Sequence, residues 1–405
     1  MFETRSPFER LRALIADVPP GAEPIDLSVG SPQHAPPAFA SKILCENASI
    51  LRSYPAISGT SEYREAIHTW LDRRYALAGF LRENGEVLPT SGSREGLFFA
   101  AFAARDLLQK AQPALLFANP FYQTYPAAAH AIGAEPVPLA ATAGVLPDFG
   151  AVPAETLDRA IGYFFGSPSN PAGDSATHDD WHTLFDLAER HDFFLFADEC
   201  YSEIYREAAG PPVGALEAAR GRPEALSRLM VFNSLSKRSN LAGLRAGFVA
   251  GGKGPMALMR EFRNQAAPQM PVPVQSAAAA ALGDEAHVVE NRRLYDEKFA
   301  LCDKLLDTRG QSIVPPAGFF LWLPCGACDV EATLALWRDG GVKSVPGSYL
   351  ALTPPGQENP GRGYVRLALV ADASSTREAL ARVQSVLGRG LCGERVAFEG
   401  AGAPR

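Results

Sequence analysis

Lys237 lies in the stretch NSLSKRSNLAGLRAGF (233–248), three residues after Ser234 and eight residues before Arg245. An S-x-x-K pair occurs in serine acyl-transfer enzymes, but those enzymes also carry S-D-N and K-T-G tripeptides. Neither tripeptide occurs in this sequence. A lysine amine can instead form a Schiff base with an aldehyde cofactor. This covalent chemistry is the hypothesis that the rest of the sequence must support.

A pyridoxal phosphate cofactor needs a lysine, a carboxylate at its pyridine nitrogen, a phosphate cradle and an aromatic platform. Asp198 ends the apolar run FFLFAD, and its ionised carboxylate could keep the pyridine nitrogen protonated. Tyr122, in NPFYQTY, could stack on the ring. Each residue also has an ordinary alternative, because an aspartate can cap a helix and a tyrosine can pack in a core. The cofactor hypothesis therefore depends on whether the sequence supplies all four groups together.

Two stretches could bind the phosphate. Ser234 and Arg245 flank the lysine, and a guanidinium offers several donors to phosphate oxygens. The sequence LAGLRAGFVAG around Arg245 is too apolar for a freely solvated arginine. The segment LPTSGSREGLFFAAFAARDLL (88–108) predicts a strand end, a turn and a helix. The backbone N–H groups of Gly92, Ser93 and Arg94, at the start of this helix, could bind a phosphate. The alternative is an ordinary serine cap.

No metal site is predicted. Cys325 and Cys328 form a single C-x-x-C without a second pair or histidines at zinc-binding spacing, which favours a simple loop. The histidines show no H-E-x-x-H pattern, and GGKG at 251–254 lacks the spacing of a Walker loop.

Composition limits the class of protein. A net charge of -7 over 405 residues argues against nucleic acid or an acidic membrane surface as the main partner. The N-terminal stretch is charged and is no secretion signal, and no apolar run reaches the length of a membrane span. Six cysteines in a chain of this length make no disulfide scaffold. We therefore expect a cytoplasmic protein.

These residues need a framework that brings them together. Apolar runs at 114–120, 161–171, 193–201 and 229–237 predict buried strands, and helical spacing at 181–191 separates two of them. This alternation indicates an α/β fold with a mostly parallel sheet. Ligands of such sheets bind beyond the carboxyl ends of the strands. We therefore expect the strand-end residues to meet there: Asn170, Asp198, Ser234 and Lys237.

Further along the chain, 288–306 predicts a long amphipathic helix, followed by strands at 317–325 and 363–370. With the N-terminal segment, these elements suggest a second, smaller α/β domain. The expected division is an N-terminal segment 1–45 that joins the small domain, a large cofactor domain 46–270, a small domain 271–390 and a tail 391–405. The Gly-rich end of the chain, from 388, is expected to be loosely ordered.

The order and spacing of these motifs resemble fold-type I aminotransferases that use pyridoxal phosphate, over nearly the whole chain. The resemblance implies a seven-stranded, mostly parallel sheet between helices, and a homodimer with shared active sites. It implies that Lys237 is the Schiff-base lysine and that Asp198 pairs with the pyridine nitrogen. The other implied roles are hydrogen bonds to the ring oxygen from Tyr201 and Asn170, stacking by Tyr122, and phosphate binding by Ser93, Arg94, Ser234 and Arg245.

The family resemblance implies roles for three more residues. Tyr54, in SYPAISGTSEYREAI, is similar to a tyrosine that reaches the phosphate in the neighbouring subunit. Arg366, in YVRLALV, is similar to the arginine that binds the substrate α-carboxylate. Gly30, in LSVGSP, is similar to the glycine whose loop closes over that carboxylate.

Within this family the chain most resembles bacterial N-succinyldiaminopimelate aminotransferases, through stretches such as FADECYSEIY and NSLSKRSNLAGLRAGFVAG. This implies transamination between N-succinyl-LL-diaminopimelate and 2-oxoglutarate or glutamate in lysine biosynthesis. The chain departs from that pattern at Ser31, Gln33 and 264–270, regions that lie near the far end of the substrate in related enzymes. Another amino acid (aspartate, N-acetylornithine or an aromatic one), a C–S lyase and a non-enzymatic binding protein are the alternatives.

Overall fold

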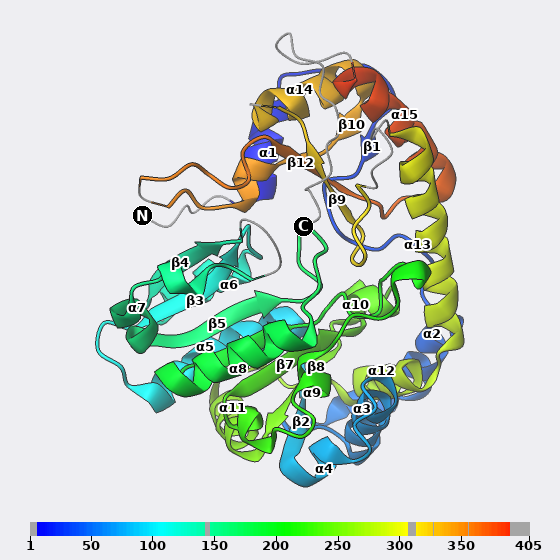
Figure 1. Cartoon of the computed structure of the whole chain (residues 1–405). Helices are drawn as coiled ribbons and strands as arrows, with labels where there is room; N and C mark the ends of the chain where they lie inside the picture. The colour runs from blue at the N-terminus through cyan, green and yellow to red at the C-terminus, as the bar shows by residue number, and fades with distance from the viewer. Residues whose placement is uncertain (1–5, 142–145, 307–312, 327, 355, 389–405) are drawn as a thin grey trace.

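The computed structural model describes residues 6–141, 146–306, 313–326, 328–354 and 356–388. The chain forms a large domain built on a seven-stranded sheet and a small domain above it in the view of Figure 1. The Gly-rich C-terminal stretch predicted to be loosely ordered lies, from residue 389, outside the described residues.

The large sheet has the strand order β2-β8-β7-β6-β5-β3-β4. Strand β8 runs antiparallel to β2 and β7, and the pairs from β7 through β6, β5 and β3 to β4 are parallel. The bounds are β2 (Gly85–Thr90), β3 (Ala114–Asn119), β4 (Glu135–Ala140), β5 (Ala160–Gly166), β6 (Phe194–Asp198), β7 (Leu229–Ser234) and β8 (Gly247–Gly252). The predicted α/β class and the four predicted central strands are confirmed.

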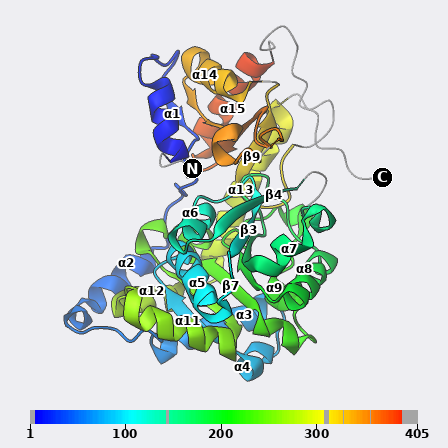
Figure 2. The same cartoon turned by 90° about the vertical axis from the view of Figure 1, so that its left-hand side faces the viewer.

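Helices cover both faces of this sheet, because alternate side chains of each strand point to opposite faces. In β7, Leu229 and Val231 belong to one hydrophobic core, and Met230 and Phe232 belong to another. The first core includes α3 (Ser61–Arg74), α8 (His178–His191) and α9 (Ala215–Ala218). The second includes α5 (Ser93–Leu108), α6 (Thr124–Ala131) and α11 (Lys253–Ala266). Figure 2 shows the sheet between these layers.

The predicted helix around 181–191 is confirmed as α8, and its ends follow local chemistry. Thr177 and Asp180 form a capping box at its start, with the Thr177 side chain accepting from the Asp180 N–H. Asp192 closes its other end in the left-handed conformation, with φ of 53°.

The small domain holds a three-stranded antiparallel sheet of order β11-β12-β9 and a two-stranded parallel sheet of β1 and β10. The N-terminal segment contacts this domain through β1, which pairs with β10. The predicted strands at 317–325 and 363–370 appear as β9 and β12. The bounds are α1 (Pro7–Ile15), β1 (Ile25–Asp26), β9 (Phe320–Pro324), α14 (Asp329–Gly340), β10 (Val342–Lys343), β11 (Val345–Pro346), β12 (Tyr364–Ala368) and α15 (Ala373–Leu387).

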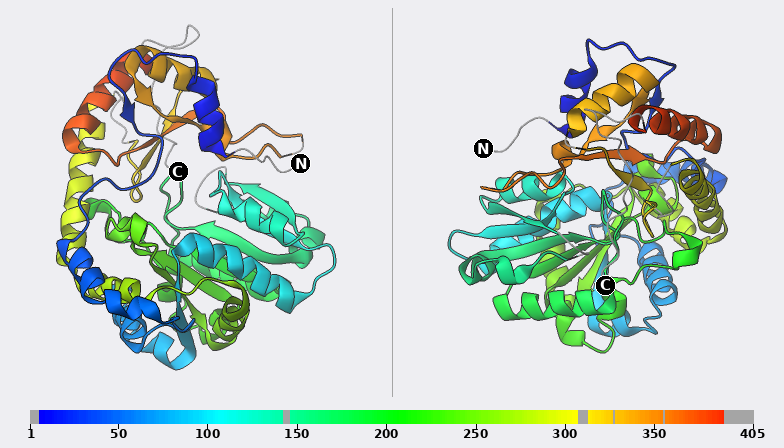
Figure 3. Two further views of the ribbon diagram at one scale, coloured as in Figure 1. Left: turned by 180° about the vertical axis from the view of Figure 1, so that it is seen from behind. Right: turned by 45° about the horizontal axis from the view of Figure 1, so that its top comes forward.

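Helix α13 (Ala286–Leu305) is the predicted long amphipathic helix, and it runs along one side of the molecule beside both domains (Figure 3, yellow). Helix α12 (Val272–Gly283), just before it, packs on α2 (Ala38–Glu46) and α3 and contributes to the core of the large domain. We therefore propose a domain boundary near 284 rather than 270, with α2 assigned to the large domain. The remaining short helices are α4 (Phe80–Asn84), α7 (Ala154–Arg159) and α10 (Leu235–Arg238).

Within the described ranges, every helix is too short or too polar to cross a lipid bilayer.

Candidate active site

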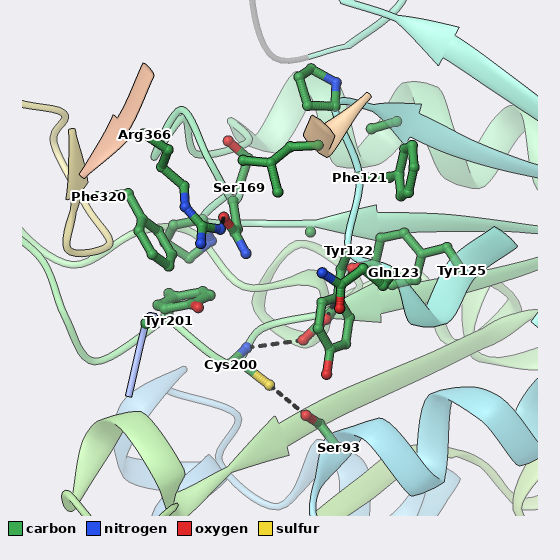
Figure 4. A pocket seen from close by; sticks show the side chains of 18 of the residues that line it. Ser93, Phe121, Tyr122, Gln123, Tyr125, Ser169, Cys200, Tyr201, Phe320 and Arg366 are labelled. Carbon is green, nitrogen blue, oxygen red and sulfur yellow. Dashed lines mark hydrogen bonds between the residues drawn. The ribbon is translucent and has the colours of Figure 1, made fainter. Parts of the chain in front are cut away.

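A cavity of about 220 Å³ lies at the carboxyl ends of the parallel strands, where the small domain faces the sheet. The large domain contributes residues that follow β3, β5, β6 and β7. The small domain and the N-terminal segment contribute Phe8, Val29, Gly30, Phe320, Leu350 and Arg366. Figure 4 shows Arg366 and Phe320 entering from one side and Tyr122 and Ser93 from the other.

The cavity brings together nine of the predicted site residues: Gly30, Ser93, Arg94, Tyr122, Asn170, Asp198, Tyr201, Lys237 and Arg366. Four others do not line it: Tyr54, Gly92, Ser234 and Arg245. The roles assigned to all of these residues remain predictions, and the geometry below shows which of them the fold can support.

Lys237 lies on α10, directly after β7, and its Nζ donates a hydrogen bond to the carbonyl of Gly30. The rings of Phe319 and Tyr201 have their centroids 5.5 and 6.0 Å from Nζ. Burial lowers the pKa of Lys237 to about 8, and the positive charges of Arg366, Arg245 and Arg94 act in the same direction. About a tenth of this amine is therefore uncharged at pH 7, and about half at pH 8.

Asp198 is the last residue of β6, and its carboxylate is fixed from two sides. Oδ2 accepts a hydrogen bond from the hydroxyl of Tyr125 at 2.9 Å, and Oδ1 accepts one from the backbone N–H of Cys200 at 3.3 Å. Burial raises the pKa of Asp198, while these hydrogen bonds and the charge of Lys237 oppose the rise. The chain forms turns after Asp198, so this residue caps no helix.

The start of helix α5 offers the phosphate cradle. Gly92 adopts φ of 82°, a conformation that favours glycine, and α5 begins at Ser93 without a side-chain cap. Its first N–H groups are therefore available to an anion. Cys200 Sγ donates to Ser93 Oγ at 2.8 Å, and Arg94 Nε donates to the Tyr122 hydroxyl at 2.6 Å (Figure 4 shows the former).

Arg245 and Ser234 are the other two residues predicted to bind the phosphate. The Arg245 guanidinium donates to the carbonyls of Ser91 and Ala242, so it sits against the turn that precedes α5. The Arg245 side chain is nevertheless exposed on a single chain. The prediction that its apolar neighbours would shield it from solvent was therefore wrong for a single chain. Ser234 is buried, and its hydroxyl donates to Ser236 Oγ at 2.9 Å.

Arg366 is 3% exposed, lies on β12 and lines the same cavity as Lys237. Its Nη1 donates to Asn170 Oδ1 at 3.0 Å, and its Nη2 donates to the carbonyl of Ser28 at 2.8 Å. Its Nε has no partner among the described residues. Phe320 lies under the guanidinium, 4.3 Å from the ring centroid. A buried cation that lines the cavity and keeps one N–H free on each terminal nitrogen is suited to bind a carboxylate.

Several lining residues were missed in the sequence. Tyr125 and Cys200 stand in stretches that were quoted for Tyr122 and Asp198, so their proximity was readable. Phe8, Phe121 and Leu350 carry no pattern that separates them from core residues. The departures Ser31 and Gln33 are exposed and lie outside the lining, and Met270 is part of the large-domain core, so a single chain does not place these positions at the substrate.

Known proteins resemble this chain in sequence and in fold. The family model for aminotransferase class I and II matches residues 22–383. LL-diaminopimelate aminotransferase of Syntrophobacter fumaroxidans is 31% identical over 90% of this chain and 92% of its own length. A crystal structure of an aminotransferase from Neisseria meningitidis superposes with a TM-score of 0.86 at 35% identity, over 95% of this chain and 98% of that one.

A probable N-succinyldiaminopimelate aminotransferase from Thermus thermophilus superposes with a TM-score of 0.80 at 28% identity, over 94% of this chain and all of that one. The predicted family and fold are confirmed by these matches, whereas the two named substrates differ. Enzymes of this class use pyridoxal phosphate, and the residues fit it: an uncapped helix start for the phosphate, a buried carboxylate at Asp198 and a buried amine at Lys237. The chain belongs to the pyridoxal phosphate-dependent aminotransferases of class I and II.

Proposed function

We propose that this aminotransferase acts on N-succinyl-LL-diaminopimelate, with 2-oxoglutarate as the amino acceptor, in lysine biosynthesis. The observation that carries the catalytic part is the meeting of three groups in one cavity: the Lys237 amine, the Asp198 carboxylate and the Arg366 guanidinium. The name of the Thermus thermophilus relative supports the choice of substrate.

Pyridoxal phosphate, when bound, supplies an electron sink that acidifies the proton on the substrate Cα. Arg366 would bind the α-carboxylate and so choose which bond at Cα is presented for reaction. Lys237, whose amine is mostly uncharged above about pH 8, would take the proton from Cα onto its Nζ. Asp198 would hold a proton on the ring nitrogen, and the start of α5 with Arg245 would bind the phosphate.

The cavity wall supports a substrate with a long methylene chain. Phe8, Phe121 and Leu350 provide apolar contacts, and Gln123 and Ser169 add polar groups. LL-diaminopimelate itself is a second candidate, because it has the same chain and because several curated relatives bear that name.

We also propose a homodimer, in which Tyr54 reaches the phosphate site of the partner. Tyr54 is 97% exposed on a single chain, which is the placement that such a contact requires. The names of the relatives are those of biosynthetic enzymes, which supports the expected cytoplasmic location. Sedimentation of the loaded enzyme tests the dimer, and a monomer at micromolar concentration would contradict it.

The substrate is tested by adding single amino donors to the loaded enzyme and following the absorbance of the cofactor. The panel is N-succinyl-LL-diaminopimelate, LL-diaminopimelate, glutamate, aspartate, N-acetylornithine and phenylalanine. We expect glutamate and the succinyl compound to convert the cofactor at the lowest concentrations. A response to LL-diaminopimelate alone would select the second candidate. A response to another donor would refute both, and release of sulfide from a cysteine conjugate without amine transfer would indicate a C–S lyase.

A further inference from the structure

Lys298, on α13, is a buried cation that the proposed reaction does not use. It is 1% exposed, and its Nζ donates to the carbonyls of Leu369 and Ala371 at 2.6 and 2.9 Å. The third contact of Nζ is His34 Nε2, at 2.8 Å. Three acceptors match the three N–H bonds of an ammonium. The ring of Tyr295 lies 4.4 Å from Nζ and adds a cation–π contact.

A chain of hydrogen bonds continues from His34 to the lysine turn. His34 Nδ1 lies 2.8 Å from Asn291 Oδ1, and Asn291 Nδ2 donates to the backbone carbonyls of Lys237 and Arg238 at 3.2 and 3.4 Å. Since carbonyls accept only, the amide nitrogen of Asn291 must face them and its oxygen must face His34. His34 Nδ1 therefore carries a proton, and its Nε2 is free to accept from Lys298.

This series of hydrogen bonds links two parts of the proposed site: the strand that carries Arg366 and the turn that carries Lys237. Leu369 and Ala371 directly follow β12, the strand that carries Arg366. His34 belongs to the segment that crosses between the domains, and the same segment meets both functional side chains. The carbonyl of Ser28 accepts from Arg366, and the carbonyl of Gly30 accepts from Lys237.

We infer that His34 and Lys298 are positioning residues, which set where the Arg366 strand stands relative to the Lys237 turn. The inference rests on the proposed roles of Arg366 and Lys237. Neither residue lines the cavity, so both act through the backbone that they hold. A shift of about 1 Å between the carboxylate site and the proton-transferring amine is expected to cost roughly 100-fold in rate.

His34 and Lys298 together carry one positive charge. In the hydrogen-bond pattern above, Lys298 carries the charge and His34 is neutral, and a second proton would place two donors face to face. Burial lowers the pKa of Lys298 to about 7, so the pair loses its charge as the pH rises through about 7. Burial and the charge of Lys298 lower the pKa of His34, so the second proton enters only below the usual histidine range. The other titratable groups around the pair are Glu290, Tyr295 and Cys302 on α13 and Asp372 before α15.

The test compares kcat/KM of the loaded enzyme in Lys298→Met, His34→Ala and the double variant, with the best donor of the panel above. We expect each single variant to lose about 100-fold. Because both residues belong to one chain of contacts, we expect the double variant to lose little more. His34→Gln keeps an acceptor for Lys298 and should recover part of the loss. Lys304→Met is the matched control, since Lys304 is exposed on the same helix and should leave kcat/KM unchanged.

Two further readouts separate positioning from general instability. The melting temperature and cofactor content of His34→Gln should stay near those of the parent, because glutamine keeps an acceptor for Lys298. His34→Ala leaves one N–H of the buried ammonium without an acceptor and should melt at a lower temperature. The acid limb of the kcat/KM profile that follows His34 protonation should be absent in His34→Gln. Multiplicative losses in the double variant, or unchanged kcat/KM in both His34 variants, would overturn the inference. If the parent enzyme reacts with no amino donor, the proposed function fails instead.

Discussion

Replacement of Arg366 by lysine tests the proposed carboxylate site most directly. The guanidinium has five N–H bonds, of which Nη1 uses one for Asn170 and Nη2 uses one for Ser28. This leaves one N–H on each terminal nitrogen for the two oxygens of a substrate carboxylate, while the Nε N–H is buried and has no partner among the described residues. A lysine keeps the positive charge but offers a single donor in the direction of the carboxylate.

The loss is therefore about one charge-assisted hydrogen bond, worth roughly 1.5–3 kcal/mol. Converted at about 1.4 kcal/mol per factor of ten, kcat/KM should fall about 10- to 150-fold in Arg366→Lys. Arg366→Ala also removes the charge and the second bond and should lose about the square of this factor. Most of the change should appear in KM, because the contact also exists in the bound ground state.

The assay is the rate of the first half-reaction, followed by cofactor absorbance at a series of donor concentrations. Arg338→Lys is the matched control, because Arg338 is a surface residue of the same domain that pairs with Asp339 and Glu331. Its kcat/KM should match the parent. A kcat/KM in Arg366→Lys within twofold of the parent would show that another residue binds the carboxylate.

Three more predictions follow from the site and its support. Lys237→Ala should lose both the absorbance of the lysine-bound cofactor and turnover, and ordinary turnover in this variant would remove Lys237 from the mechanism. Burial places the pKa of Lys237 near 8, so capture of added cofactor by the apoenzyme should accelerate as pH rises through about 8 and level off above it; a pH-independent capture rate between 6 and 9 would contradict this. Glu95 accepts two hydrogen bonds from the fully buried Arg263, at 2.9 and 3.0 Å. Glu95→Ala should therefore lower the free energy of unfolding by about 3–5 kcal/mol in denaturant titrations. Glu46→Ala, which removes one partner of an exposed ion pair, should change the free energy of unfolding by less than about 1 kcal/mol.

The sequence by itself determined the class of the fold and most of the chemistry. Apolar runs of strand length at 114–120, 161–171, 193–201 and 229–237 are typical of strands buried on both faces in a mostly parallel sheet. Once these runs are strands, their polar ends must meet at one edge, and Asp198 and Lys237 do so in the cavity. Local composition suffices here because strand formation and strand ends depend on neighbouring residues.

Contacts between distant segments were decided only by the tertiary structure. Phe8 and Leu350 reach the cavity from α1 and from the 3-10 helix Gly347–Leu350 after β11, and no local pattern distinguishes them from core side chains. Arg245 was expected to be shielded by its apolar neighbours and proved exposed: Gly243 is exposed as well, and Arg245 adopts the left-handed conformation, with φ of 54°, before the buried strand β8 begins. The bond between His34 and Lys298 joins residues 264 positions apart. Its existence depends on how the two domains pack, and that relation is set by the whole core rather than by any stretch of sequence.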